Sequence, residues 1–285
     1  MKLPKIGIVI PCFNGWEFTK KCIISIKNCN YSNYEIIIVN DGSTDSTLNS
    51  LRVDFPEIVV YNGDGYLWWS KSMNIGIEIA FNGGAEYILV LNNDVEIGLN
   101  TFDALIGVAL ENDNAIVGSL VMDLKSPKNI WSSGGKMVWP WPGEVQLNDL
   151  KGFKNNHRYV DWNPGMGTLI PRHIFKKLVG FDSKNFPQYM GDVDFCLRAI
   201  KLGFKIIVTS SSVIYNNIEN TGGVIEGNKR FCYRDIYEIF QSYRSPDLLK
   251  ARLRFIFRHS PLHFLFPALF IRYSKLFFYI IKKIK

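Results

Sequence analysis

Three small polar residues, Asn92, Asn93 and Asp94, directly follow the apolar run of residues 87–91. Five apolar or aromatic residues in a row predict a strand that is buried on both faces, as in a parallel sheet covered by helices. Ligands of open α/β sheets bind beyond the carboxyl ends of such strands. Asn92 and Asp94 are two residues apart, so both side chains can turn toward one point and offer oxygen atoms to a hard divalent cation. On these residues alone, a polar turn after a strand is an equally good interpretation.

Three further polar clusters have the same character, namely residues 11–14, 40–45 and 191–194. The first two directly follow predicted buried strands, and the third begins a predicted helix. Because the carboxyl ends of parallel strands meet at one edge of a sheet, we expect the first two clusters to lie beside the polar residues at 92–94.

The elements that must position these clusters alternate regularly in the first half of the chain. Strands are predicted near 6–10, 35–39, 58–61, 87–91 and 115–121, with helices near 16–28, 45–55, 73–81 and 101–111. Asn14 is expected to cap the first of these helices, and Ser43 or Asp45 the second. The pattern predicts a doubly wound, mostly parallel α/β sheet flanked by helices. A GxGxxG motif after the first strand and a Walker lysine motif are both absent, which argues against dinucleotide binding and ATP hydrolysis.

The second half is less regular. Beyond loops and short strands at 125–164, we expect a strand at 168–170, a helix after Pro171, a helix from 191 to about 203 and a strand at 205–208. Four tryptophans can line a ligand pocket or belong to the core, and both interpretations stay open; they are Trp68, Trp69, Trp139 and Trp141.

Composition sets the class of protein. The chain has 285 residues, of which 47% are hydrophobic, and this suits either one large domain or one domain plus an appendage. Its five cysteines show no metal-binding spacing and are expected to be reduced thiols of a cytosolic protein. No signal peptide is expected, because the N-terminal lysines precede only a short apolar strand.

Positive charge is concentrated at the C-terminus. The formal net charge is +7, yet nine basic residues and no acid follow position 247; the nine are Lys250, Arg252, Arg254, Arg258, Arg272, Lys275, Lys282, Lys283 and Lys285. A basic and strongly apolar tail on a near-neutral body argues for an anionic membrane surface rather than nucleic acid.

The tail is expected to form an amphipathic helix. On one face lie the apolar residues Phe266, Leu269, Phe270, Tyr273, Phe277, Ile280 and Ile284, and on the other lie four cations. Pro261 and Pro267 place the start of a regular helix near position 267. The uncharged run 260–271 is far shorter than the roughly 20 residues of a spanning helix, so we expect the helix to lie on the membrane. Packing of this helix on the main domain is the alternative.

The order and spacing of the four polar clusters resemble the family 2 glycosyltransferases of the GT-A fold, over roughly residues 5–215. The stretch 63–69 and the Asn92-Asn93-Asp94 form are most similar to the rhamnosyltransferase-like branch, which builds bacterial surface polysaccharides. The resemblance implies a catalytic domain at 1–245, with a nucleotide-sugar-binding half at 1–121 and an acceptor-binding half at 122–245. Residues 246–285 would form the tail.

The resemblance implies a donor site for a dTDP- or UDP-linked sugar. Asp41 would hydrogen-bond the pyrimidine base, Pro11 and Phe13 would shape that pocket, and Asn74 would help to hold the donor. The donor-binding set is completed by Asn14, Asn92 and Asn93. The alternatives are a turn or capping role for Asp41 and an ordinary helix-surface position for Asn74.

The resemblance also implies a metal ion, Mg²⁺ or Mn²⁺, which bridges the donor diphosphate. Asp94 would bind it, with Asn92 in the place of the family's first acid, so a weaker metal site is expected. Many relatives have a metal-binding His after the strand that matches 205–208, and this chain has none there. Asn217 could supply an oxygen instead, or the metal could lack this ligand.

Asp192 matches the family's catalytic base, which takes the proton of the acceptor hydroxyl. The acceptor would lie against Gly165, Gly167 and Gly191. A capping role for Asp192 is the alternative, whereas Asp194 is expected to pair with Arg198 four residues later.

The sequence therefore predicts an inverting, metal-dependent glycosyltransferase that acts on a glycan acceptor, expected to be lipid-linked, at the cytoplasmic face of a membrane. The same fold could instead serve as a non-catalytic sugar- or nucleotide-binding subunit. A nucleotidyltransferase is a third possibility, but residues 11–15 lack the Lys or Arg that it would want.

Overall fold

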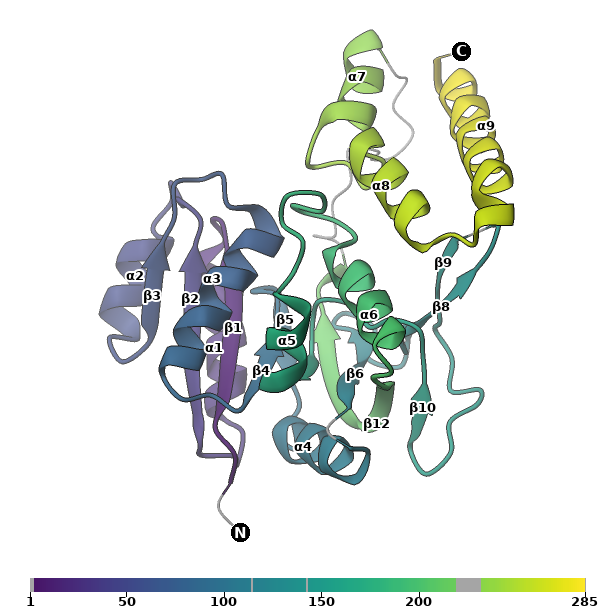
Figure 1. Cartoon of the computed structure of the whole chain (residues 1–285). Coiled ribbons are helices and arrows are strands. Elements are labelled where there is room, and N and C mark those ends of the chain that lie inside the picture. The colour runs from purple at the N-terminus through teal and green to yellow at the C-terminus, as the bar shows by residue number, and fades with distance from the viewer. Residues whose placement is uncertain (1–2, 114, 142, 219–231, 285) are drawn as a thin grey trace.

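One mixed sheet runs through the molecule, with strand order β10-β12-β6-β11-β4-β1-β2-β3 (Figure 1). The computed structural model describes residues 3–113, 115–141, 143–218 and 232–284. The strands of this sheet are β1 (Ile6–Cys12), β2 (Tyr34–Asn40), β3 (Val59–Asn62), β4 (Tyr87–Val90), β5 (Val95–Ile97), β6 (Ile116–Asp123), β7 (Ile130–Ser132), β10 (His157–Tyr159), β11 (Thr168–Pro171) and β12 (Ile206–Asn216). A separate hairpin is formed by β8 (Gly135–Val138) and β9 (Gly143–Gln146).

The predicted doubly wound α/β fold is confirmed, with one antiparallel insertion. Strands β3, β2, β1 and β4 are parallel neighbours, and β6 pairs in parallel with β12. Between these two groups, β11 pairs antiparallel with both β4 and β6. The polar carboxyl ends of the parallel strands therefore meet along one edge of the sheet. Because β11 is antiparallel, its amino end lies at that edge.

Helices cover both faces of the sheet. They are α1 (Trp16–Lys27), α2 (Thr47–Asp54), α3 (Trp68–Asn82), α4 (Thr101–Glu111), α5 (Arg172–Leu178), α6 (Gly191–Lys201), α7 (Tyr233–Gln241), α8 (Leu249–His259), the short 3₁₀ helix η2 (Leu262–Phe264) and α9 (Leu265–Ile284). Along β1, Val9 packs in one core with α3, α5 and α6, whereas Ile8 and Ile10 pack in the other core with α1 and α4. Both faces of the strand are buried, which explains its continuous apolar sequence.

Two local predictions are corrected. Strand β1 continues through Pro11 to Cys12, because β4 already ends opposite Val9 and the missing N–H of Pro11 interrupts no ladder on that side. Asn14 does not cap α1: the cap position is Gly15, with φ of +81°, and no side chain caps this helix. In contrast, Oδ1 of Asp45 accepts the N–H of Thr47 at the start of α2, at 2.9 Å.

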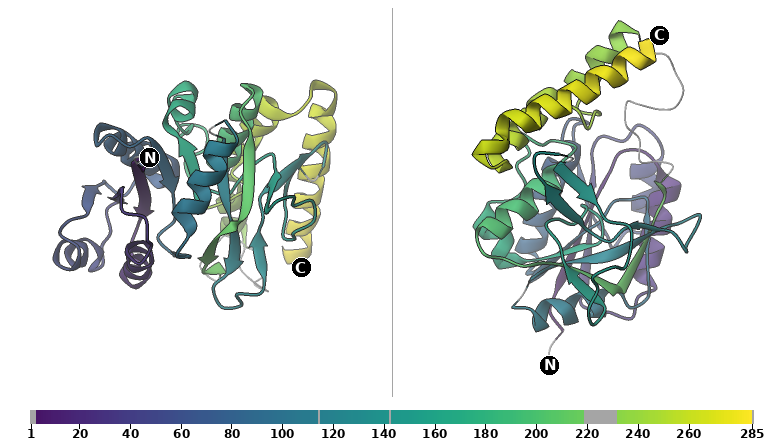
Figure 2. Two further views of the ribbon diagram at one scale, coloured as in Figure 1. Left: turned by 90° about the horizontal axis from the view of Figure 1, so that it is seen from below. Right: turned by 90° about the vertical axis from the view of Figure 1, so that its right-hand side faces the viewer.

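The C-terminal helices begin against the main body. Leu248, Ala251 and Phe255 of the α8 region are buried in the same core as α3 and α6. Helix α9 then runs beside α7 at the end of the molecule (Figure 2). The main body and the predicted tail, which begins at residue 246, therefore share one hydrophobic core. Lys285, one of the nine tail cations, lies outside the described residues.

Buried charges hold α8 in place. Asp194 is wholly buried and pairs with Arg198 at 2.8 Å, as predicted. It also pairs with Arg258 of α8 at 2.8 Å and with His259 at 2.9 Å. Arg258 in turn contacts Asp182 at 2.7 Å. The first tail helix is thus fixed to α6 by charge-assisted hydrogen bonds.

Candidate active site

The loops after β1 and β2 are joined by hydrogen bonds. Oδ1 of Asn14 accepts the backbone N–H of Thr44 at 2.8 Å, and the Asn14 N–H donates to Oγ of Ser43 at 2.7 Å. The N–H of Gly15 donates to Oδ2 of Asp45 at 2.9 Å. The predicted meeting of the two clusters is confirmed. Asn14 acts here as a bridge between the loops, and the neighbouring side chain of Phe13 is exposed.

Asp41 organises the loop that leads into α3. Its carboxylate is 8% exposed and accepts the backbone N–H groups of Gly65, Leu67 and Trp68, at 2.9–3.1 Å. The negative charge thereby satisfies otherwise free donors at the beginning of a helix. This is the capping role that the sequence left open, and recognition of a base by Asp41 stays a prediction.

Asn74 is likewise engaged with backbone. Its side-chain amide donates to the carbonyl of Phe181 at 2.8 Å and accepts the N–H of the same residue at 2.9 Å. This paired contact fixes the turn after α5 against α3. Asn74 is therefore neither an ordinary surface residue nor visibly free to bind a donor.

Trp69 connects the polar end of β4 with the region around α6. Its indole N–H donates to Oδ1 of Asn92 at 3.1 Å, and its backbone N–H donates to Oε1 of Gln188 at 3.1 Å. The ring lies so close to Gly165 that a Cβ at this position would be only 2.3 Å from it. From the sequence, Trp69 was one of four tryptophans that could line a pocket or belong to the core. Its position shortly after the polar loop 62–65 is the feature that could have indicated a place in the site.

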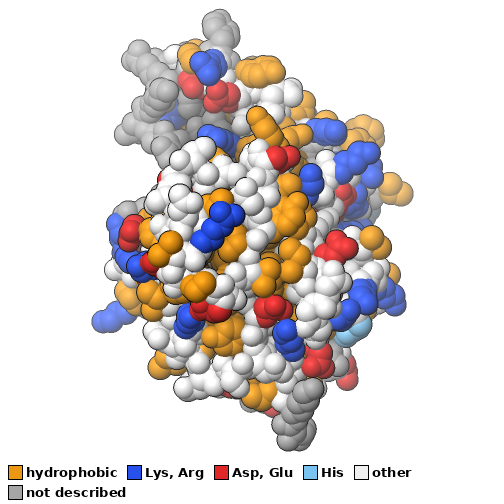
Figure 3. All heavy atoms as spheres, turned by 90° about the vertical axis from the view of Figure 1, so that its left-hand side faces the viewer, with side chains coloured by type: hydrophobic (Ala, Val, Ile, Leu, Met, Phe, Trp, Pro, Cys, Tyr) orange, Lys and Arg blue, Asp and Glu red, His pale blue; other side chains and the backbone are white. Residues whose placement is uncertain are grey.

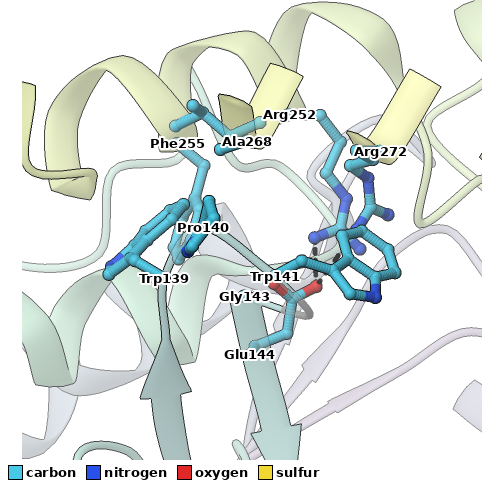
Figure 4. A pocket seen from close by; sticks show the side chains of 10 residues that line it. Trp139, Pro140, Trp141, Gly143, Glu144, Arg252, Phe255, Ala268 and Arg272 are labelled. Atoms are coloured by element: carbon cyan, nitrogen blue, oxygen red, sulfur yellow. Dashed lines mark hydrogen bonds and ion pairs between the residues drawn. The ribbon is translucent and has the colours of Figure 1, made fainter. Parts of the chain in front are cut away.

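The other tryptophans lie elsewhere. Trp68 packs edge-on against Tyr243, in the segment between α7 and α8, with ring centres 5.4 Å apart. Trp139 and Trp141 lie at the tip of the β8–β9 hairpin, against α8 and α9 (Figure 4). Trp68 thus touches the predicted site only through its backbone N–H, which binds Asp41, whereas the indole of Trp69 itself bonds to Asn92.

Asp192 lies near the beginning of α6 and is half-buried as a residue. Oδ2 accepts the N–H of Gly165 at 2.8 Å, and Oδ1 accepts the N–H of Val193 at 2.8 Å. Removal of the carboxyl from water raises its pKa above the usual range of an aspartate. A fixed carboxylate with a raised pKa suits a proton acceptor.

The three glycines predicted to contact an acceptor are closely packed. Gly165, Gly167 and Gly191 are all buried. Gly167 donates to the carbonyl of Val90, accepts the N–H of Ser119, and has a positive φ of +67°. Other groups approach all three glycines closely, which accounts for their small size, and contact with an acceptor stays a prediction.

Asp94 and the end of β12 hold several oxygens without a partner. Within the described residues, Oδ1 of Asp94 is buried with no hydrogen bond, and the same is true of Oδ1 in both Asn216 and Asn217. The two segments are adjacent, since the N–H of Asn217 donates to the carbonyl of Asp94 at 3.3 Å. Burial also raises the pKa of the Asp94 carboxyl. Unpaired buried oxygens are costly, and a cation would satisfy them.

The residues present therefore fit a hard cation through carboxylate and amide oxygens. Within the described ranges, no group of three or more His, Cys, Asp or Glu could hold a metal. Asn92 is bonded to Trp69, and Nδ2 of Asn93 donates to Oγ1 of Thr19 on α1 at 3.0 Å. Of the three polar residues after β4, Asp94 has a buried oxygen that bonds to no other described residue.

A mostly parallel sheet with this polar edge, interrupted by one antiparallel strand, agrees with the GT-A fold that the sequence resemblance implies. The model of glycosyl transferase family 2 matches residues 7–175, more than half of the chain, and the chain belongs to this family.

Relatives and solved structures agree with this assignment. An uncharacterized glycosyltransferase of Rickettsia typhi is 27% identical over 70% of this chain, which spans 59% of the length of that protein. Glycosyltransferase GlyG of Streptococcus pneumoniae is 27% identical over 88% of this chain and 85% of its own length. The crystal structure of GalNAc-T7 with UDP, GalNAc and Mn²⁺ matches with a TM-score of 0.64 at 16% identity, over 75% of this chain and 44% of its own. That likeness shows the fold alone.

Proposed function

We propose that this protein transfers a sugar from a dTDP- or UDP-linked donor to a glycan, with inversion at the anomeric carbon. One connected set of contacts carries the proposal. Asn92 at the end of β4 binds the indole of Trp69, Trp69 packs on Gly165, and the N–H of Gly165 binds Asp192. The donor-side strand end and the proposed base are thereby held in a fixed relationship, which such a displacement requires.

In the proposed reaction, Asp192 takes the proton of an acceptor hydroxyl. The hydroxyl oxygen then bonds to the anomeric carbon as the bond from that carbon to the diphosphate breaks, and the nucleoside diphosphate leaves with the bonding electrons. Backbone N–H groups of Gly165 and Val193 hold the carboxylate oriented for this transfer. The raised pKa makes the ionised carboxylate a stronger base than an exposed aspartate.

A divalent cation, Mg²⁺ or Mn²⁺, would be held by Asp94, with the amide oxygen of the neighbouring Asn217 as a second candidate ligand. When bound, it would supply positive charge that offsets the charge on the leaving diphosphate. Asn217 offers only a neutral amide, so this site should bind metal more weakly than one built from several carboxylates. The Mn²⁺ in the structure of GalNAc-T7 supports metal use by the fold.

We further propose a role in bacterial surface polysaccharide synthesis at the cytoplasmic face of the membrane, with a lipid-linked acceptor and a hexose or deoxyhexose as the transferred sugar. The loop 63–69 and the Asn-Asn-Asp form support the rhamnosyltransferase-like branch. The reduced state of all five cysteines agrees with a cytoplasmic site. Nucleic acid is not proposed as a partner.

Thermal-shift measurements against dTDP-, UDP- and GDP-sugars with Mn²⁺ test the proposal, because a ligand that binds only the folded state raises its apparent stability. Stabilisation by one nucleotide sugar and slow hydrolysis of that sugar without acceptor are expected. Binding without any hydrolysis or transfer would favour a non-catalytic subunit. Failure to bind any nucleotide sugar would contradict the proposed donor.

A further inference from the structure

Helix α9 has two apolar faces, and the described part of the protein covers only one of them. The covered face carries Ala268 and Ile280, which are buried, and Leu276, which packs with Ile280 against Ile239 of α7. The uncovered face, named here the aromatic stripe, continues from η2 through the whole length of α9. Its residues are between 49% and 89% exposed: Leu262, Phe266, Phe270, Phe277, Phe278 and Ile284.

The sequence pattern alone placed residues of both faces in one apolar set. A packed helix needs only one apolar face, so packing on α7 and α8 accounts for Ile280 but leaves the aromatic stripe unexplained. Exposed aromatic side chains that adjoin over several turns usually mark a surface for an apolar partner.

The partner is constrained by charge. Residues 248–285 contain no acid, and Lys250, Arg254, Lys275 and Lys282 are exposed on α8 and α9. The opposite side of the molecule differs: Lys and Arg are interspersed there with Asp and Glu (Figure 3). An apolar stripe whose own helix and neighbour α8 carry only positive charge is complementary to a lipid surface with anionic head groups.

We propose that the aromatic stripe of α9 inserts into the interfacial layer of an anionic membrane, with the helix axis parallel to the surface. By length and composition alone, the described stretch Leu262–Ile284, with a mean hydropathy of 1.5, is able to cross a membrane. Arg272 in its middle, however, forms an ion pair with Asp247 and lies near Glu144, with which it also pairs at 3.9 Å (Glu144 and Arg272 are shown in Figure 4). Spanning would break these pairs and carry a cation into the hydrocarbon core, whereas lying on the surface keeps them.

This placement also orients the enzyme. Helices α7, α8 and α9 extend from the end of the molecule at which β1, β2 and β4 finish (Figure 1). The membrane surface and the candidate active site are therefore at the same end. An acceptor anchored in lipid would reach the site without leaving the membrane. The inference itself rests on α9 and does not depend on the proposed reaction.

Co-sedimentation of the full chain with vesicles tests the inference. We expect binding to phosphatidylglycerol vesicles at low salt, much weaker binding to pure phosphatidylcholine, and loss of about tenfold or more in the double variant Phe270→Asp, Phe277→Asp. A matched control is Val53→Asp, which replaces a residue that is 77% exposed on α2. The control should bind as the wild type does. Acceptor-independent donor hydrolysis and the melting temperature should be unchanged in both variants, which separates this test from that of the proposed function.

Several outcomes would overturn the inference. These are no binding of the wild type to anionic vesicles, equal binding by the double variant, or equal binding to both lipids. Retention in membranes after extraction at pH 11 would show a spanning helix instead. A dimer of the wild type that the double variant abolishes, together with absence of vesicle binding, would assign the stripe to a second copy of the chain.

Discussion

The indole N–H of Trp69 lies 3.1 Å from Oδ1 of Asn92, so a residue at the start of α3 is bonded to the polar end of β4. The same ring packs on Gly165, whose N–H binds Asp192. Trp69 therefore lies between the two parts of the site that sequence motifs identify separately. If the hydrogen bond between Trp69 and Asn92 positions these two parts of the site, its loss should lower turnover more than it lowers the stability of the fold.

Replacement of Trp69 by Phe tests this role, since Phe keeps an aromatic ring but lacks the N–H. Loss of one hydrogen bond typically costs about 0.5–1.5 kcal/mol, so kcat/KM should fall by about two- to tenfold. Trp68→Phe is the matched control, because Trp68 contacts Tyr243 and not Asn92. Steady-state kinetics and thermal melting check both variants. Equal kcat/KM in Trp69→Phe and the wild type would exclude a positioning role.

Asp192→Asn removes the proposed proton acceptor while it keeps the shape of the side chain. Turnover should fall by about 10²–10⁴-fold with donor binding nearly intact. The wild-type rate should rise with pH as Asp192 ionises, at a pH above the usual aspartate range because its pKa is raised. That rising limb should be absent in the variant. More than a third of wild-type transfer by Asp192→Asn would refute the assignment.

The same pKa shift has a consequence for stability with a definite sign. The folded state binds the proton of Asp192 more tightly than the unfolded state, so the ionised carboxylate destabilises the fold once the pH exceeds its unfolded pKa. Measured by denaturant unfolding, the stability of the wild type relative to Asp192→Asn should therefore fall as the pH rises from acid to 7. A relative stability of the wild type that rises over this range would contradict the sign.

Much of the fold was predictable because burial leaves a strong pattern. Helix α4 was expected at 101–111 and is found there, and the strand before Asn92 has the expected apolar sequence. The antiparallel pairing of β11 could not be predicted, because a short apolar strand does not specify its neighbours or its direction. The sequence analysis assigned the residues of both apolar faces of α9 to a single face, for a related reason. Helical periodicity identifies apolar positions, but tertiary contacts decide which of them are covered.

The site was predictable to a lesser extent. The positions of the motifs correctly predicted that the loops around Asn14 and Asp45 lie together. It did not reveal that Asp41 and Asn74 bind backbone groups, because such contacts depend on loops that are distant in the sequence. Polar side chains near a ligand site often support its walls, and composition alone cannot separate that role from direct contact.

Metal dependence is tested by Asp94→Ala, which removes the carboxylate among the unpaired oxygens near β5 and β12. We expect the affinity for nucleoside diphosphate to lose its dependence on Mn²⁺, as measured by isothermal titration with and without the metal. Asn217→Ala should weaken the Mn²⁺ effect less, because an amide oxygen carries no net charge. Asp103→Ala, an exposed acid on α4, is the control. Equal affinities for wild type and Asp94→Ala in both conditions would remove Asp94 from the metal site.

Asp194 should matter for stability, since it is wholly buried and contacts Arg198, Arg258 and His259. Burial alone would raise its pKa, but the hydrogen bond with His259 and the charges of both arginines hold the pKa below the usual aspartate value. Its stabilising contribution is therefore complete above the unfolded pKa, near 4, and is lost as the pH falls through the lower folded value.

Asp194→Asn leaves two arginines without their buried counter-charge, and loss of one partner from a buried ion pair costs about 3–5 kcal/mol. Urea unfolding at pH 7 should show this loss, and the difference between variant and wild type should shrink in acid. Asp54→Asn is a suitable control, because Asp54 forms an exposed pair with Lys20 at 2.9 Å and should change stability by less than about 1 kcal/mol. If both variants lost equally little, the contact between α6 and α8 would not depend on this charge, and packing of Phe255 in the core would be the main attachment of the tail.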